Sequence, residues 1–236
     1  MYKLLMDTAY GVCFVHDKGL FKTLGKQFTD KIMKMSLVRT LKRERGQPQE
    51  FPIAGKVYII HEGLVFLSYI NEGGKKVILD VLTTGSIFGD LDFSKEKNYP
   101  NESLFIEPFQ EAKVCEINKD NFEEILKDNP EFTLQLLSSF SNKLVSLEQR
   151  LGTLVFSDVE ARLVAQIITL GKEHGEDTEV KTKLNIKITH EKLAEMVGAA
   201  RETVSEAMSN LRKKGVVSND ANGAIILHKD KVEDVF

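Results

Sequence analysis

The stretch IKITHEKLAEMVGAARETVSEAMSNLRKKGVV spans residues 186–217 and predicts two short amphipathic helices joined by a sharp turn. Thr189 is of a residue type that caps a first helix, and Gly198 gives the turn the backbone freedom that it needs. Apolar side chains recur at helical spacing along one face of each helix: Leu193, Ala194 and Val197 in the first, and Val204, Met208 and Leu211 in the second. The pattern as a whole predicts a helix-turn-helix.

The second predicted helix begins with Arg201 and Glu202, two side chains of complementary hydrogen-bonding chemistry. The first turn of such a helix enters the major groove, where an arginine can donate to both acceptors of guanine and a carboxylate can accept from the cytosine amino group. An Arg-Glu pair alone is typical of an ordinary surface helix, but here the complete two-helix pattern favours DNA binding. The predicted DNA-contacting residues are Thr189, His190, Arg201, Glu202, Thr203, Ser205, Glu206, Ser209 and Lys213.

This region resembles the DNA-binding signature of the CRP/FNR family of bacterial transcription regulators. The resemblance rests on the RETVS run at 201–205 and on the LRKKG run at 211–215, and it continues upstream in the stretches VYII (57–60), GSIFGDL (85–91) and FSDV (156–159). It therefore covers nearly the whole chain. It implies a homodimer with a sensor domain, a dimerising helix and a DNA-binding domain, and RNA polymerase as a partner if the protein is an activator.

Composition agrees with a multidomain globular protein. The chain has 236 residues, of which 42% are hydrophobic and 28% charged, enough for two modest cores. It contains no uncharged apolar run long enough to span a membrane, and Lys3 and Asp7 interrupt the N-terminus too early for a secretory leader, so we expect a cytoplasmic protein without a membrane partner. Because the net charge is −3, any contact with a double-stranded operator has to come from a local basic patch. The candidate patch residues are Lys187, Lys192, Arg201, Arg212, Lys213 and Lys214.

The fold class that we predict is α+β. Residues 20–127 show apolar-polar alternation punctuated by glycines, as in the segments around Val57, Val65 and Val77, which indicates short antiparallel strands. These strands indicate a β-roll or barrel, and the resemblance implies a β-roll, a jelly roll like that of cyclic-nucleotide-binding domains. The predicted domains are an N-terminal segment and β-roll sensor at 1–129, a long dimerisation helix at 130–156, and a winged helix-turn-helix at 157–236.

A stripe of large apolar residues follows Pro130 at alternating spacings of three and four, the pattern of a coiled-coil seam. The alternative is a helix that packs on its own β-domain. The resemblance favours the seam, because members of the family pair through a helix at this position. The predicted seam is Leu137, Phe140, Leu144, Leu147, Leu151 and Leu154.

Three local expectations complete the C-terminal part. The run Ser157 to Glu160 predicts a capping box that ends the long helix and starts a new one, from Arg162 to about Lys172, at a hinge. The polar run 174–179 predicts a loop. Apolar residues on both sides of Asn222-Gly223 predict the hairpin of a wing.

The recognition helix departs from the family pattern in ways that bear on its preferred DNA sequence. Ala200 replaces a serine or threonine and cannot cap the helix with its side chain, which costs about 1 kcal/mol. Glu206 replaces an arginine, and Ser205 stands where one branch of the family makes a thymine-side contact. We expect a pseudo-palindromic operator in which Arg201 and Glu202 read a G·C pair in each half.

The resemblance places an effector pocket at Gly89, Asp90, Leu91, Glu102 and Ser103. In the cyclic-nucleotide-binding branch an arginine followed by serine pairs with the cyclic phosphate, and an ungapped count places that pair on Glu102 and Ser103. An acidic residue facing a phosphate costs binding energy, and Asp90 is shorter than the glutamate that meets the ribose. The sequence therefore disfavours cyclic AMP and leaves the effector, and any cofactor, unidentified.

Two cysteines leave a redox signal open. Cys115 aligns with one cluster-ligating cysteine of the family's oxygen-sensing branch, and Cys13 lies in the segment that holds the others. Two thiolates cannot supply the four ligands of the usual iron–sulfur cluster, so that cofactor is disfavoured. A reversible disulfide between Cys13 and Cys115 has precedent in similar members. The alternative is a buried, inert Cys115 and an incidental Cys13.

Together these features predict a sequence-specific, homodimeric DNA-binding transcription regulator controlled by a small molecule or by thiol redox state. The alternative is a small-molecule-binding regulatory protein that acts through protein partners, and a constitutive regulator without an effector is a third hypothesis. The sequence shows no nucleophile motif, no phosphate-binding glycine loop and no clustered metal ligands. We therefore expect neither enzymatic activity nor a metal site.

Overall fold

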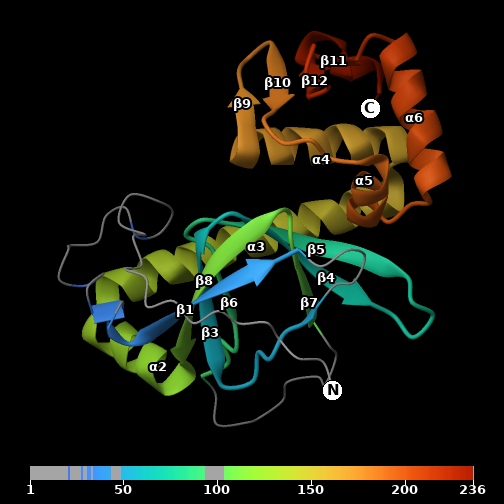
Figure 1. The fold of residues 1–236 in the computed structure, drawn as a ribbon. Helices are drawn as coiled ribbons and strands as arrows, with labels where there is room; N and C mark the ends of the chain where they lie inside the picture. The colour runs from blue at the N-terminus through green and yellow to red at the C-terminus, as the bar shows by residue number, and fades with distance from the viewer. Residues whose placement is uncertain are drawn as a thin grey trace. The chain divides into compact units, whose positions relative to one another are not determined.

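The computed structural model describes residues 34–43, 49–93 and 104–235, together with the isolated positions 21, 28, 31 and 32. The chain divides into two compact units, Met1–Asn142 and Lys143–Phe236 (Figure 1). No helix in the described part of the chain combines the length and apolar character that crossing a bilayer requires.

The first unit contains the β-roll that the sequence predicts. It is built from two four-stranded antiparallel sheets, with strand orders β1-β8-β3-β6 and β2-β7-β4-β5. The strands are β1 (Ser36–Lys42), β2 (Gln49–Glu50), β3 (Lys56–Glu62), β4 (Leu64–Ile70), β5 (Lys76–Thr83), β6 (Ile87–Gly89), β7 (Leu104–Pro108) and β8 (Glu111–Asn118).

The central strand β3 is buried on both faces, more deeply than its alternating pattern predicts. Val57, Tyr58, Ile59 and Ile60 are each 0% exposed. Tyr58 and Ile60 face a core with apolar residues of the second sheet, whereas Val57 and Ile59 face the helices α2 (Lys119–Asp128) and α3 (Pro130–Phe156). The helix side chains in that second core are Phe122, Ile125, Phe132 and Leu136. The roll therefore needs these helices to cover its outer face.

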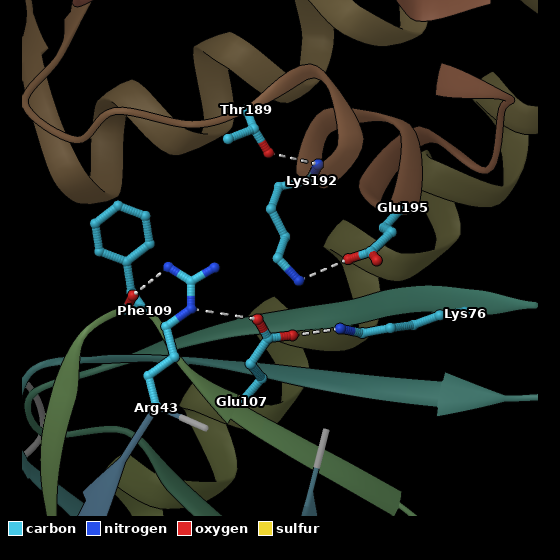
Figure 2. A network of polar contacts seen from close by, with 7 residues as sticks. All are labelled: Arg43, Lys76, Glu107, Phe109, Thr189, Lys192 and Glu195. Carbon is cyan, nitrogen blue, oxygen red and sulfur yellow. Dashed lines mark hydrogen bonds and ion pairs between the residues drawn. The ribbon is translucent and has the colours of Figure 1, made fainter. Parts of the chain in front are cut away.

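Glu107 of β7 links strand ends of the two sheets (Figure 2). It pairs with Lys76 at the start of β5 and lies 3.9 Å from Arg43 Nε, just past β1. Arg43 also donates to the Phe109 carbonyl at 3.3 Å. Glu107 and Lys76 are largely buried, so their ion pair holds the sheet edge more firmly than the exposed Arg43 does.

Gly89 marks a close approach between β6 and β3. Its φ is +115°, and a Cβ built there would lie 2.4 Å from the Lys56 carbonyl oxygen. Both the backbone conformation and the space therefore exclude a side chain at this position.

We expect Gly89→Ala to lower the free energy of unfolding of the first unit by about 3 kcal/mol or more, because the strand pair has to shift. Gly74→Ala is the matched control: its φ is +75°, but nothing lies within 4 Å of the added Cβ. The control should lose only about 1–2 kcal/mol of conformational strain. Urea unfolding of both variants measures the difference, and equal losses would show that the contact with Lys56 is unimportant.

The second unit packs three helices against a small sheet. The helices are α4 (Val159–His174), α5 (His190–Val197) and α6 (Arg201–Lys213), followed by a 3-10 helix at Lys229–Asp234. The antiparallel sheet has the order β11-β12-β10-β9, with β9 (Gly175–Asp177), β10 (Lys181–Leu184), β11 (Val217–Asn219) and β12 (Ile225–His228). The hairpin β11-β12 is the predicted wing.

Two local expectations for this unit are wrong. The polar run 174–179 is not a loop, because α4 extends through His174 and residues 175–177 form β9, which pairs with β10. The helix α4 is capped by Asp158 rather than Ser157, since Asp158 Oδ1 accepts from the Ala161 amide at 2.9 Å. With this cap the helix begins at Val159, before the predicted Arg162.

Candidate functional site

The helix α5 is fixed at both ends by the residues that the sequence singles out. Thr189 Oγ1 accepts from the Lys192 amide at 3.2 Å, and the Lys192 ammonium lies 2.9 Å from Glu195 (Figure 2). At the other end Gly198 adopts φ +66°, the left-handed conformation that ends a helix and turns the chain. This corner sets the direction in which α6 leaves.

The helix α6 separates a buried face from an exposed one, as its periodicity predicts. Val204, Ala207, Met208 and Leu211 are buried against the rest of the unit. Its N-cap residue is Ala200, which makes no side-chain hydrogen bond. The amides of the first turn therefore lack a side-chain cap from Ala200, as expected from the sequence.

All nine residues predicted to contact DNA lie on α6 or at the N-terminus of α5. The exposed ones are Thr189, Arg201, Glu202, Thr203, Glu206 and Lys213. The half-buried ones are His190, Ser205 and Ser209. The first two turns of α6 thus present one guanidinium donor with two carboxylate acceptors, a set that can hydrogen-bond base edges.

His190 contacts Ser205, an interaction that joins the two helices and that the sequence pattern does not reveal. Nδ1 of His190 lies 2.9 Å from Ser205 Oγ. Burial, followed by the positive charges of Arg212 and Arg201, lowers the pKa of His190 below its ordinary value. The imidazole is therefore neutral at pH 7. The two residues are 15 positions apart, and no periodic signal connects them.

The three basic residues at the end of α6, Arg212, Lys213 and Lys214, are all exposed, but two of them also make polar contacts within the unit. Arg212 Nε donates to Asn219 Oδ1 of the wing at 3.1 Å, and Lys214 pairs with Glu160 of α4 at 2.6 Å. Lys213 is exposed. Arg212 and Lys214 thus help to hold α6 in the unit, and Lys213 remains the best placed of the three for a phosphate.

Arg150, near the end of α3, also supports the helix-turn-helix. Its guanidinium donates to the Met196 carbonyl in the last turn of α5. Carbonyls in a last helical turn lack intrahelical partners, so the arginine satisfies one of them. No local sequence pattern predicts this hydrogen bond, because 46 residues separate the two.

The long helix α3 carries a largely exposed apolar stripe. Five of the six predicted seam residues are at least 40% exposed: Leu137, Leu144, Leu147, Leu151 and Leu154. Phe140 instead packs against the β-roll core. Leu134, Val155 and Phe156, which the prediction omitted, are also exposed, at 64%, 72% and 89%.

In the predicted effector pocket, Asp90 is engaged within the chain. One carboxylate oxygen lies 2.7 Å from Lys119 Nζ and the other accepts from the Gly55 amide at 3.0 Å. Burial by itself raises the pKa of Asp90, but these hydrogen bonds outweigh it and hold the pKa below its ordinary value. Leu91 packs against the helix-facing core. Glu102 and Ser103 lie outside the described residues.

Cys115 is 0% exposed on β8 and forms a disulfide bond. Cys13, the other cysteine of the chain, lies outside the described residues. Within the described ranges, no three His, Cys, Asp or Glu side chains are grouped so that they could hold a metal ion.

Comparison with known families matches both units. The Crp-like helix-turn-helix domain matches residues 161–235, and the cyclic nucleotide-binding domain matches residues 49–129. These ranges contain the helix-turn-helix with its wing and most of the β-roll.

Curated relatives extend the likeness along the chain. The anaerobic regulatory protein of Bacillus subtilis is 30% identical over 176 residues, which are 75% of this chain and 73% of that protein. The global nitrogen regulator of Nostoc is 27% identical, covering 80% of this chain and 82% of its own. The cAMP-activated global transcriptional regulator CRP of Salmonella typhimurium is 28% identical, covering 74% and 80%.

Solved structures share the fold. A CooA mutant from Carboxydothermus hydrogenoformans superposes with a TM-score of 0.71 at 19% identity, covering 97% of each chain. A CRP/FNR-family transcriptional regulator from Thermus thermophilus superposes with a TM-score of 0.61 at 23% identity, covering 84% of this chain and 97% of its own.

Proposed function

The chain belongs to the CRP/FNR family of transcription regulators and is a DNA-binding regulator with a sensory β-roll; from this premise we propose that it acts as a homodimer on a pseudo-palindromic operator. Its two α6 helices would enter successive major grooves, about 34 Å apart. Its place of action is the cytoplasm, with RNA polymerase as a further partner if it activates transcription.

The observation that carries the proposal is the exposed stripe on α3. Burying an exposed leucine side chain contributes about 1.5–3 kcal/mol of favourable free energy. Five such side chains per protomer would offset the cost of association when they are buried against their counterparts. Pairing also matters for DNA affinity, because the overall charge of −3 gives each protomer little attraction for phosphates.

We assign recognition of the DNA sequence to residues at the start of α6. Arg201 would donate to a guanine, and Glu202 would accept from the cytosine amino group of the same or a neighbouring pair. Thr189, at the N-terminus of α5, and Lys213 would contact the backbone. In support, the side chains of all four are exposed.

For the signal, we favour thiol redox state over cyclic AMP. Both oxygens of the Asp90 carboxylate already have a partner, Lys119 and the Gly55 amide, which leaves fewer lone pairs for a ribose hydroxyl and adds to the cost already posed by Glu102. Cys115 supports the redox signal because it is disulfide-bonded. We assign Cys13 as its partner; a cellular dithiol would reduce the bond to two thiols, itself becoming a disulfide.

The test is a selection of bound sequences from random DNA, run with oxidised and with reduced protein. We expect a two-fold-symmetric motif in both, with operator affinities that differ by about 5- to 150-fold between the two states. Cys13→Ser should remove that difference while keeping the motif. Identical motifs and yields in the two conditions would contradict the redox signal, and the lack of any motif would contradict operator recognition.

A further inference from the structure

The contact between His190 and Ser205 bears on which bases the regulator selects. Ser205 lies four residues after Arg201, on the same side of α6. Among the described residues, His190 is the one side-chain partner of its hydroxyl group, at 2.9 Å. Both side chains are half-buried, so each has one side in the protein and one side toward solvent.

A serine hydroxyl has a single proton, and a neutral imidazole has one donor and one acceptor nitrogen. Burial, followed by the positive charges of Arg212 and Arg201 on α6, lowers the pKa of His190 and keeps the imidazole neutral at pH 7. If Nδ1 accepts, the Ser205 hydroxyl donates its hydrogen bond to His190 and has only lone pairs left for a ligand. If Nδ1 donates, the hydroxyl proton is available to the ligand instead.

Contact with DNA determines which of these two hydrogen-bonding arrangements of His190 and Ser205 forms. In a helix-turn-helix complex the first helix crosses the phosphate backbone. His190 is the first residue of α5, and its Nε2 is the ring nitrogen that Ser205 does not occupy. An Nε2–H can donate to a phosphate oxygen, whereas an unprotonated Nε2 would turn a lone pair toward an anion. Phosphate contact therefore leaves the proton on Nε2 and makes Nδ1 the acceptor.

We propose that His190 is a positioning residue that makes Ser205 a hydrogen-bond acceptor toward DNA, so that α6 selects an exocyclic amino group at the base facing Ser205. The candidate bases are adenine, through N6, and cytosine, through N4. This rests on the proposed reading of the operator by α6. On the DNA-facing side of α6, Arg201 is then a hydrogen-bond donor, whereas Glu202, Ser205 and Glu206 are all acceptors.

The experiment measures binding to operators carrying each of the four bases at every half-site position. Because every base pair carries one amino group in the major groove, the operators are also made with analogues of adenine and cytosine that lack this group. At one position the replacement should lower the affinity of the wild-type protein by about fivefold, the effect of a single hydrogen bond. Ser205→Ala should abolish that loss and leave the preferences at the other positions unchanged. The four bases also distinguish which of the two amino groups is read.

Two substitutions of His190 provide a readout that a purely structural role would not move. His190→Lys supplies a partner that can only donate, so the Ser205 hydroxyl becomes a donor toward DNA and the preferred base pair at this position should change. His190→Ala removes the partner, so the affinity loss caused by removing the amino group should disappear without a new preferred base pair. Unchanged preferences at the Arg201 and Glu202 positions serve as the control for a correctly folded helix-turn-helix.

Full affinity of the wild-type protein for every operator that lacks one amino group would overturn the inference. So would a fivefold loss that survives both His190 substitutions. If no half-site motif emerges, or if Arg201→Ala leaves the motif intact, the proposed reading of the operator fails and this inference fails with it. If instead the motif is present and depends on Arg201 but shows no effect of Ser205, only the inference about Ser205 fails.

Discussion

Arg201→Ala is expected to lower the affinity for the selected operator by at least about 30-fold. A bidentate arginine-guanine contact contributes about 1–3 kcal/mol of discrimination, and a dimer would lose two of them. The loss should be confined to specific binding, because on random DNA the substitution removes only one charge per protomer. Titrations of operator and random duplexes at the same salt concentration measure both effects.

Lys213→Ala is the matched control, since Lys213 is an exposed cation at the other end of α6. It should weaken binding to all sequences alike and reduce the salt dependence by about one unit for each phosphate that is no longer neutralised. Glu202→Ala should relax the preference at one base pair by about 1–3 kcal/mol. If Arg201→Ala instead weakened operator and random DNA equally, base reading by this residue would be excluded.

The second large effect is expected from the apolar stripe on α3. The double variant Leu144→Glu, Leu151→Glu should be monomeric at micromolar concentration, because it replaces two exposed leucines per protomer, each contributing about 1.5–3 kcal/mol when buried, with mutually repelling charges. Analytical ultracentrifugation measures the mass. Operator affinity should also fall when dimerisation is lost, since a single half-site provides only half of the interactions with DNA.

Ser146→Glu is the control for the added charge, because Ser146 is exposed on α3 but lies about 200° around the helix from Leu144. It should remain dimeric and bind the operator normally. A double leucine variant that stayed dimeric would exclude this face as the interface, and a wild-type monomer would contradict pairing altogether.

The elements with strong periodicity could be predicted from the sequence, and the interactions between them could not. The helix-turn-helix was predictable because its apolar face, Thr189 cap and Gly198 corner all lie within one short stretch. The strand β9 could not be predicted because Gly175–Asp177 is short, polar and at the edge of its sheet, so no alternating apolar pattern marks it.

Long-range polar partners explain the other differences. The Asp90 carboxylate is 29 residues from Lys119, and the His190 imidazole is 15 residues from Ser205. Such pairs depend on the tertiary arrangement rather than on local pattern. Phe140 has the spacing of a seam residue, yet the neighbouring β-roll core provides a closer apolar surface. Periodicity shows which face of a helix is apolar and does not show which surface covers it.

The helix α3 contributes Phe132 and Leu136 to the β-roll core and, near its other end, Arg150 to the carbonyl of Met196. A hybrid regulator made by grafting a foreign sensor onto this DNA-binding half would therefore have to be spliced inside a continuous helix. One extra residue at the splice turns everything after it by about 100°. Viable chimaeras should consequently be those whose junctions add or remove whole heptads.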